Sequence, residues 1–285
     1  MNNAIKQMLE RYSCRSFQEH EQALREILQE IALVGLWRGK FFEHAAFYGG
    51  TALRVFYHLD RFSEDLDFTV LTPNPKWSWQ PFEEAIRSEF SSFGFDVSFE
   101  EKEKEKKTQT AVKSAFLKTP TFQELLKIGV PSDLLKGTHP ETLIRIKVEI
   151  DTAPTVEYVY EQKFLSQPIA VSVRCVNEEC LFACKMNAAL FRAWKGRVKG
   201  RDWYDVVWFL RRKVPLNLAF FSKLTGRETV LDRAAFLTLA KERIEQLNVA
   251  SAIEDIIHFV RDQEAIQRTW SKEFFLHWID TIATS

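Results

Sequence analysis

Two adjacent glycines are the first residues in the chain whose placement could serve chemistry. Gly49 and Gly50 follow a short apolar run, 44–48, that predicts a strand, and they precede a stretch, 51–58, that predicts a helix. Backbone amides exposed at a helix N-terminus bind phosphate well, and glycine lets the backbone approach a ligand closely. This corner is therefore a candidate phosphate-binding site.

Two aspartates follow the predicted helix. Asp65 and Asp67 lie two residues apart in a segment, 65–71, that alternates polar and apolar residues. Side chains two apart on a strand point to the same side, so the carboxylates converge. At about 4 Å and an effective dielectric constant near 20, two such charges repel by about 4 kcal/mol, which a divalent cation would relieve. Mg²⁺, or Mn²⁺ in its place, could bridge the carboxylates to substrate phosphates.

A third carboxylate comes from the clearest predicted strand, 143–151. Its residues alternate strictly, with Glu149 on the polar side together with Arg145 and Lys147. A two-metal site usually takes a further carboxylate from a neighbouring strand, and the two cations would complement an anionic substrate. The predicted metal ligands are Asp65, Asp67 and Glu149.

A predicted helix in the second half of the chain carries cations on one face. Lys185, Ala188, Ala189 and Arg192 follow the spacing i, i+3, i+4, i+7. Small alanines between two cations would let a flat or anionic ligand approach. The alternative is a helix that packs through its alanines and leaves the cations in solvent.

The surrounding segment is strongly basic. Residues 185–213 contain nine Lys or Arg and two acids, a net charge of +7 in a chain with no net charge. Cations for phosphates, with aromatic residues for stacking, would suit an RNA end. The alternative is a solvated basic surface over a core of aromatic residues, and we expect Trp203 and Tyr204 to lie mainly in the core. The interleaved aromatic residues include Phe191, Trp194, Trp203 and Tyr204.

In this order, the motifs resemble the AbiEii/AbiGii nucleotidyltransferase toxins, a family of the DNA polymerase β-like nucleotidyltransferase superfamily. The resemblance covers residues 47–205, and the set of motifs is more specific than any one of them. The last 70 or so residues add nothing to it. The segments that carry it are GGTAL at 49–53, RFSEDLDF at 61–68, KVEI at 147–150, the lysine helix at 185–192 and RDWYD at 201–205.

The resemblance implies a role for each matching residue. Glu149 would assist the acceptor side, Lys185 would contact the triphosphate, and either Asp202 or Asp205 would be the essential acid of the last motif. The implied nucleotide-binding residues are Gly49, Gly50, Thr51, Arg61, Ser63, Lys185 and Arg192. The implied catalytic residues are Asp65, Asp67, Glu149, Lys185, Asp202 and Asp205.

Members of this family act as toxins in bacterial toxin–antitoxin and phage-defence pairs. Some transfer nucleotides to the 3′ end of tRNA, which blocks aminoacylation, and others are linked to GTP binding. The resemblance therefore implies a Mg²⁺-dependent nucleotidyltransferase with an NTP as substrate, an RNA acceptor such as tRNA, and a cognate antitoxin. Two alternatives stay open: a catalytically silent nucleotide- or antitoxin-binding module, and a transferase that modifies a protein or a small molecule.

The elements that must position these residues indicate an α+β protein. We expect a nucleotidyltransferase-like mixed sheet flanked by helices in residues 1–174. Residues 175–285 would form an all-helical domain that completes the active-site cleft. Expected strands are 44–48, 65–71, 96–100, 111–117 and 143–151. Expected helices are 17–37, 51–58, 82–93, 121–128, 178–194, 203–212, 234–247, 252–261 and 272–282.

The composition agrees with a packed globular protein. Of 285 residues, 46% are hydrophobic, which permits a large core. Lys and Arg total 39, as do Asp and Glu, so a uniformly basic nucleic-acid coat is excluded. Four cysteines form no disulfide framework, and neither a secretory segment nor an apolar run of about 18 residues is present. We therefore expect a reduced cytoplasmic chain with free thiols and no membrane span.

Overall fold

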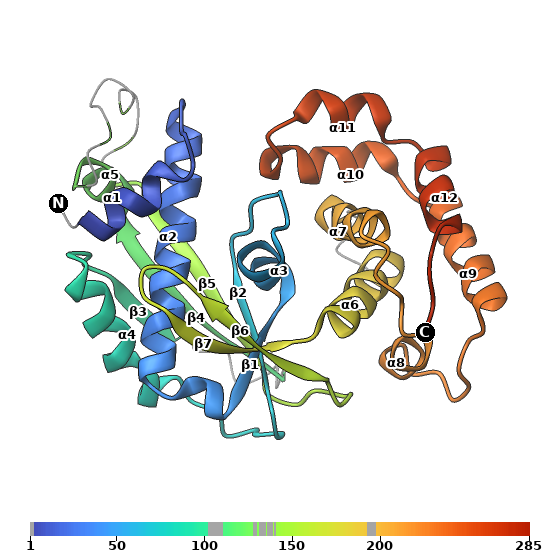
Figure 1. Ribbon diagram of the computed structural model, residues 1–285, viewed down its shortest axis with the longest axis horizontal. Helices are drawn as coiled ribbons and strands as arrows, with labels where there is room; N and C mark the ends of the chain where they lie inside the picture. Colours follow the sequence, from blue (N-terminus) through green and yellow to red (C-terminus); the bar gives the residue numbers. More distant parts are fainter. Residues whose placement is uncertain are drawn as a thin grey trace. The chain divides into compact units, whose positions relative to one another are not determined.

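The computed structural model describes residues 3–101, 111–127, 130, 135, 139, 141–192 and 198–285 (Figure 1). The chain divides into two compact units. The first contains Met1–His58, Ser63–Pro154 and Glu161–Cys175, and the second contains Leu59–Phe62, Thr155–Tyr160 and Val176–Ser285. Neither unit is continuous in sequence, because the short segments Leu59–Phe62 and Thr155–Tyr160 interrupt the first unit and belong to the second.

A mixed sheet forms the centre of the first unit. Its strand order is β3-β4-β5-β2-β1-β7-β6. β2 pairs in parallel with β5 and antiparallel with β1, while β4 pairs antiparallel with both β5 and β3. This arrangement confirms the predicted α+β fold class. The strands are β1 (Ala45–Tyr48), β2 (Leu66–Val70), β3 (Ser98–Glu101), β4 (Val112–Pro120), β5 (Leu143–Asp151), β6 (Tyr160–Leu165) and β7 (Val171–Val176).

The strict alternation of β5 appears in its burial. Ile144, Ile146, Val148 and Ile150 are buried, whereas the residues between them are exposed or half-buried. The buried side chains belong to the main hydrophobic core. The sheet therefore has one apolar face and one polar face, and Glu149 lies on the polar one.

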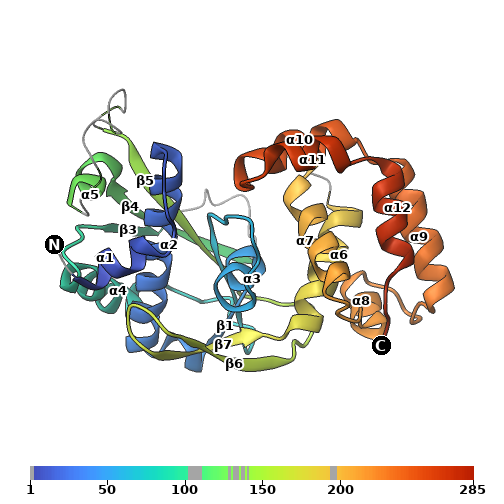
Figure 2. The same cartoon turned by 45° about the horizontal axis from the view of Figure 1, so that its top comes forward.

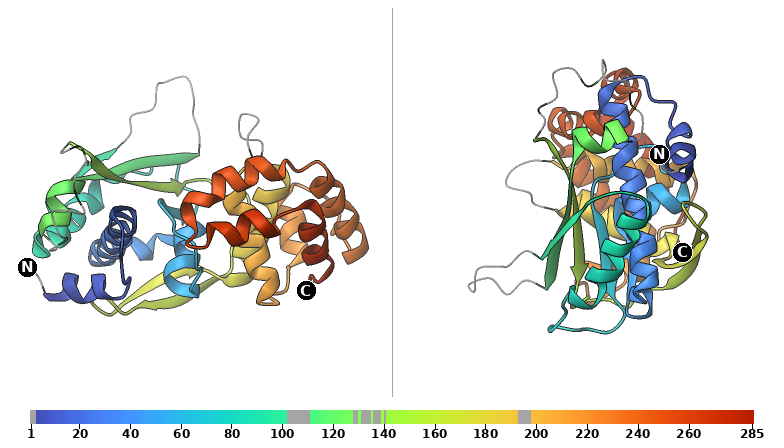
Figure 3. Two further views of the ribbon diagram at one scale, coloured as in Figure 1. Left: turned by 90° about the horizontal axis from the view of Figure 1, so that it is seen from above. Right: turned by 90° about the vertical axis from the view of Figure 1, so that its left-hand side faces the viewer.

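Helices cover the apolar face of this sheet. α2 is fixed at its start by a capping box between Ser16 and Glu19. It packs against α4, and the right-hand view of Figure 3 shows both helices on the same side of the strands. The helices of this unit are α1 (Asn3–Glu10), α2 (Phe17–Arg38), the 3-10 turn η1 (Phe41–Glu43), α3 (Gly49–Tyr57), α4 (Gln80–Ser92) and α5 (Thr121–Lys127).

The second unit is built of helices, as the sequence indicates. α6 packs on α7 and α8, and α9 runs beside α12 (Figure 2). Side chains of Asn, Asp or Ser cap every helix from α8 to α12 as well as α6. The helices are α6 (Glu178–Phe191), α7 (Gly200–Arg211), α8 (Leu218–Leu224), α9 (Arg233–Glu245), α10 (Val249–Ile256), the 3-10 turn η2 (Ile257–Phe259), α11 (Gln263–Thr269) and α12 (Lys272–Asp280).

α7 starts differently from its neighbours. No side-chain cap is present at Lys199; instead, the Asp255 carboxylate accepts a hydrogen bond of 3.2 Å from the backbone N–H of Arg201. At Gly200 an added Cβ would lie 1.8 Å from the carbonyl oxygen of Ala252. A glycine is therefore required where α7 meets α10. Within the described part of the chain, no helix is both long and apolar enough to cross a membrane.

Several elements lie outside the sequence-based prediction. Strands β6 and β7 and helices α1, α8 and α11 were not expected. β6 has the sequence YEQKFL and forms an edge of the sheet, with Phe164 76% exposed. An edge strand buries only part of each face, so its sequence lacks the alternation by which β5 is recognised.

Candidate active site

The glycine corner lies where β1 ends and α3 begins. Gly49 has φ +83°, in the region that favours glycine, and it starts α3 with no side-chain cap on Tyr48. A Cβ at Gly49 would lie 2.5 Å from the Oδ2 atom of Asp67. The helix N-terminus and the Asp67 carboxylate are thus in direct contact, and only glycine leaves space for that carboxylate.

The loop before β2 is fixed from two helices. The Thr51 hydroxyl of α3 donates to the carbonyl oxygen of Asp65 and lies 2.9 Å from Ser63 Oγ. Gln29 of α2 donates its amide N–H groups to the carbonyl oxygens of Ser63 and Glu64, at 3.1 and 2.9 Å. Thr51 is fully buried. Its contacts therefore hold the loop that delivers Asp65, and Ser63 lies beside it.

The three predicted metal ligands lie on, or directly before, two adjacent strands. Asp65 directly precedes β2, Asp67 lies within β2, and both are half-buried. In the parallel pairing of β2 with β5, Asp67 is the register partner of Glu149, so their side chains share the polar face of the sheet. Neither aspartate is turned into the hydrophobic core.

Glu149 is engaged by its own neighbours. Its Oε1 atom accepts a hydrogen bond of 2.9 Å from the Ser114 hydroxyl of β4 and lies 2.7 Å from the Lys147 ammonium. Lys147, expected to complement an anionic substrate, pairs with Glu149 instead, and Ser114 was not among the predicted site residues. The i, i+2 spacing of Lys147 and Glu149 on one strand face is the signal that could have predicted their ion pair.

The family resemblance implies a divalent cation, and the donor atoms of the predicted ligands can be compared with what such a cation binds. Asp65 and Asp67 offer the hard carboxylate oxygens that Mg²⁺ and Mn²⁺ take. Among the described residues, however, no three His, Cys, Asp or Glu side chains are arranged as a ready metal-binding group. The two aspartates fit a cation that is completed by substrate oxygens, and the contribution of Glu149 stays a prediction.

The second unit holds a network of alternating charges. The Lys185 ammonium on α6 lies 2.8 Å from Asp205 Oδ2 and 3.5 Å from Asp202 Oδ1. Arg192 Nη1 lies 3.1 Å from Asp202 Oδ2. Arg61, from the segment Leu59–Phe62, completes the network through Asp205. The structure therefore brings together all five predicted site residues that belong to this unit.

Arg61 and Asp205 form the buried end of that network. Arg61 donates from Nε and Nη2 to the two carboxylate oxygens of Asp205, at 2.6 and 2.7 Å. Burial alone would raise the pKa of Asp205, but the charges of Arg61 and Lys185 and their hydrogen bonds outweigh it and hold that pKa below its ordinary value. Asp205 is therefore ionised at neutral pH.

The basic segment is only partly described. Trp194, Lys195 and Arg197 lie outside the described residues. Trp203 is buried against Phe275, as expected, whereas Tyr204 is half-buried and donates to Asp60 Oδ1 at 2.7 Å. Three arginines of the basic segment lie over aromatic rings, namely Arg201 over Phe259, Arg211 over Trp278 and Arg212 over Trp208.

The chain matches a known protein family over most of its length. Residues 31–276 match the family model described as the nucleotidyl transferase AbiEii toxin of type IV toxin–antitoxin systems. The chain belongs to the AbiEii family. This confirms the resemblance carried by the sequence motifs and identifies a nucleotidyltransferase toxin of a type IV system.

A solved structure shares the fold of this AbiEii protein. JHP933 from Helicobacter pylori superposes with a TM-score of 0.50 at 19% sequence identity, over 90% of this chain and 88% of that one. A second H. pylori structure, of a protein proposed to be a nucleotidyltransferase, has a TM-score of 0.44 at 17% identity, over 91% of this chain and 89% of that one. No curated protein sequence matches the chain.

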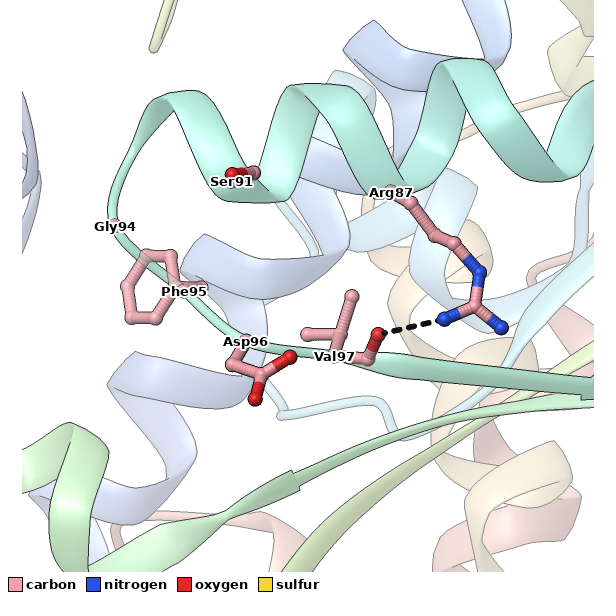
Figure 4. A pocket seen from close by; sticks show the side chains of 6 residues that line it. All are labelled: Arg87, Ser91, Gly94, Phe95, Asp96 and Val97. Carbon is pink, nitrogen blue, oxygen red and sulfur yellow. Dashed lines mark hydrogen bonds between the residues drawn. The ribbon is translucent and has the colours of Figure 1, made fainter.

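A pocket in the first unit of the AbiEii protein lies apart from every predicted site residue. It measures about 450 Å³ and is lined by the last turns of α4 and by the turn, 94–97, that leads to β3 (Figure 4). Its one cation, Arg87, is held by Glu83 and by the carbonyl oxygens of Val97 and Phe99. This pocket therefore offers no free cation for a phosphate group.

Proposed function

We propose that this AbiEii-family protein transfers a nucleotidyl group from an NTP to an RNA acceptor, with the 3′ end of tRNA as the preferred acceptor. The observation that carries the proposal is the contact between Gly49 and the Asp67 carboxylate. It joins a helix N-terminus suited to phosphates with an acid suited to a divalent cation. Glu149 lies in register on the adjacent strand.

In the proposed reaction an acceptor hydroxyl attacks the α-phosphorus of the NTP. The new O–P bond forms as the bond to pyrophosphate breaks, and pyrophosphate leaves. Backbone N–H groups at Gly49 and Gly50, with the Ser63 hydroxyl, would orient the phosphates. Lys185 and Arg192 would bind the triphosphate. Glu149 would take the proton of the acceptor hydroxyl on Oε2, while Lys147 and Ser114 hold its Oε1 atom.

Asp65 and Asp67 would hold Mg²⁺, or Mn²⁺ in its place. When bound, such a cation neutralises negative charge that develops on the phosphates. The pair has the right donor chemistry, and the half-buried position of both aspartates leaves them open to substrate.

An RNA acceptor is favoured by the charge and aromatic content of the second unit. The net charge of +7 in residues 185–213 supplies cations for a phosphate backbone. Arginines that lie over Phe259, Trp278 and Trp208 hold their guanidinium groups in fixed orientations. A cytoplasmic location, where NTPs and tRNA are found, goes with this proposal.

The test is a transfer assay with each labelled NTP, total tRNA and Mg²⁺ or Mn²⁺. We expect label on tRNA from the wild-type protein, and a loss of at least about a hundredfold in rate for Asp65→Asn, because the substitution removes a charge at the reacting phosphate. Glu100→Gln is the matched control. That acid lies on the edge strand β3, is paired with Lys118, and should transfer at the wild-type rate.

Other results would point to the alternatives. An Asp65→Asn protein as active as the wild type would overturn the proposal. Nucleotide binding in calorimetry without transfer to any acceptor would favour a binding module. Label on protein or small molecules in a lysate, and none on tRNA, would indicate that the acceptor is a protein or a small molecule. A neighbouring reading frame for a small winged-helix protein would support the cognate antitoxin.

A further inference from the structure

Arg61 is buried far more deeply than a nucleotide-binding residue would need to be. It is 2% exposed, and its partner Asp205 is fully buried. Besides its two bonds to Asp205, its Nη1 group donates to the carbonyl oxygen of Phe62 at 2.8 Å. The guanidinium group is therefore used within the protein, which leaves it little capacity for a ligand.

Both carboxylate oxygens of Asp205 are also bound by other residues of the protein. Each carboxylate oxygen accepts a bond from Arg61, and Oδ2 lies 2.8 Å from the Lys185 ammonium as well. A substrate could reach this carboxylate only if these contacts broke. The nearest group through which Asp205 can act is therefore Lys185, whose side chain is 14% exposed.

Asp202 differs from Asp205 in each of these respects. Its contact with Lys185 is longer, at 3.5 Å. Its Oδ2 atom lies 3.1 Å from Arg192 Nη1, yet it has no partner with hydrogen-bond geometry. Arg192 is half exposed. The network thus runs from a fixed buried end at Arg61 to a loosely held end at Arg192.

We propose that Arg61 and Asp205 form a positioning pair that holds the Lys185 ammonium in place for the triphosphate, and that neither contacts the substrate. This assigns Asp205 a role through Lys185 and moves Arg61 out of the nucleotide-binding set. The inference rests on the proposed function only for the ligand of Lys185. The positioning of the ammonium is a property of the protein without ligand.

A purely structural role can be separated from a positioning role by substituting both partners. Removal of one partner of a buried ion pair leaves an unpaired charge and destabilises the fold, whereas replacement of both by apolar residues often restores stability. In Arg61→Met/Asp205→Leu the fold can recover, but Lys185 loses its 2.8 Å acceptor and keeps only Asp202 at 3.5 Å. The double variant therefore isolates the orientation of Lys185.

The experiment compares the wild type, both single variants and the double variant in three measurements. These are the midpoint of denaturant unfolding, the rate of Lys185 acylation by acetic anhydride followed by mass spectrometry, and kcat and KM for NTP transfer. We expect lowered midpoints in the single variants and a near wild-type midpoint in the double variant. The double variant should nevertheless acylate Lys185 at least threefold faster and lose at least tenfold in kcat/KM.

Arg268→Met serves as the control, because Arg268 forms an exposed ion pair with Glu264 in the same unit and lies outside the basic segment 185–213. It should leave all three measurements unchanged. A double variant with wild-type Lys185 reactivity and wild-type transfer would overturn the proposal, since the pair would then be structural only. If the double variant does not fold, the near-isosteric Asp205→Asn protein provides the Lys185 measurement with the same expected rise.

Failure of the proposed function would be visible separately. A wild-type protein that transfers nothing to any acceptor contradicts the transferase assignment, while Lys185 acylation still tests the positioning pair. A rise in that rate on loss of Asp205 supports the pair, and an unchanged rate refutes it.

Discussion

At the scale of single residues, position 49 has two requirements that only glycine meets. Its φ of +83° strains any residue with a side chain, and its Cβ position is taken by the Asp67 carboxylate. The first requirement concerns the backbone alone, and the second concerns the candidate site. A second glycine, Gly94, has the same φ of +83° with nothing within 4 Å of its Cβ position, so the two effects can be measured separately.

We predict that Gly49→Ala abolishes transfer activity, with a loss of at least about a hundredfold, because the added methyl group displaces the Asp67 carboxylate. Gly94→Ala should cost only the backbone strain, about 1–2 kcal/mol, and keep full activity. Denaturant unfolding and the NTP transfer assay measure the two effects. Equal activity in both alanine variants would show that the position of Asp67 does not depend on Gly49.

At the scale of elements, a buried charge cluster ties the start of the chain to α2. Arg11, just after α1, lies 2.9 Å from the Glu30 carboxylate of α2, and Arg54 of α3 bonds Glu26 one turn away. Burial raises the pKa of Glu30 to about 7, against the opposing charge of Arg11. Burial and Glu26 also raise the pKa of Tyr12 above its ordinary value.

This cluster predicts a pH dependence of stability. Because the pKa of Glu30 is higher in the folded protein than its ordinary value of 4.5, folding favours the protonated carboxyl. The contribution of Glu30 is therefore fully present below about pH 4.5 and is lost as the pH rises through about 7. Glu30→Gln should remove this decline from the free energy of unfolding, measured by denaturant titrations between pH 4.5 and 8. A wild type and variant with parallel pH profiles would contradict the raised pKa.

At the scale of the whole molecule, the two units are interleaved along the chain. The segment Leu59–Phe62 lies between α3 and β2 in sequence but belongs to the helical unit. There Asp60 accepts from Tyr204, Arg61 pairs with Asp205, and the N–H of Phe62 donates to the carbonyl oxygen of Phe259. A cut at residue 175 therefore removes part of the helical unit.

We predict that fragment 175–285 is markedly unstable, because Asp205 loses Arg61 and stays buried. Removal of one partner of a buried ion pair costs about 3–5 kcal/mol, and the 2.8 Å contact of Asp205 with Lys185 stays within the fragment. Asp205→Leu should stabilise this fragment, although the same substitution destabilises the full chain by leaving Arg61 unpaired. Thermal unfolding followed by circular dichroism measures both. A fragment as stable with Asp205 as with leucine would contradict the account of the buried pair.

The features that the sequence determined by itself are those set by neighbours along the chain. The period-2 alternation of 143–151 predicted β5 and the polar face of Glu149, and the chain was correctly expected to become helical beyond residue 175. The ordered set of motifs, from GGTAL at 49–53 to RDWYD at 201–205, carried the family resemblance without any coordinates. The strand and helix signals depend on backbone geometry that repeats over two to four residues, and each motif is a short run of neighbouring residues.

The features that only the tertiary structure decided are contacts between distant residues. Arg61 and Asp205 are 144 positions apart, and Ser114 and Glu149 are 35 apart. The sequence could not show that Arg61 is buried, and it left Asp202 and Asp205 equivalent. Pairing and burial of charges depend on which segments the folded chain brings together, because a charged side chain has the same local preferences whether its partner is solvent or a buried carboxylate.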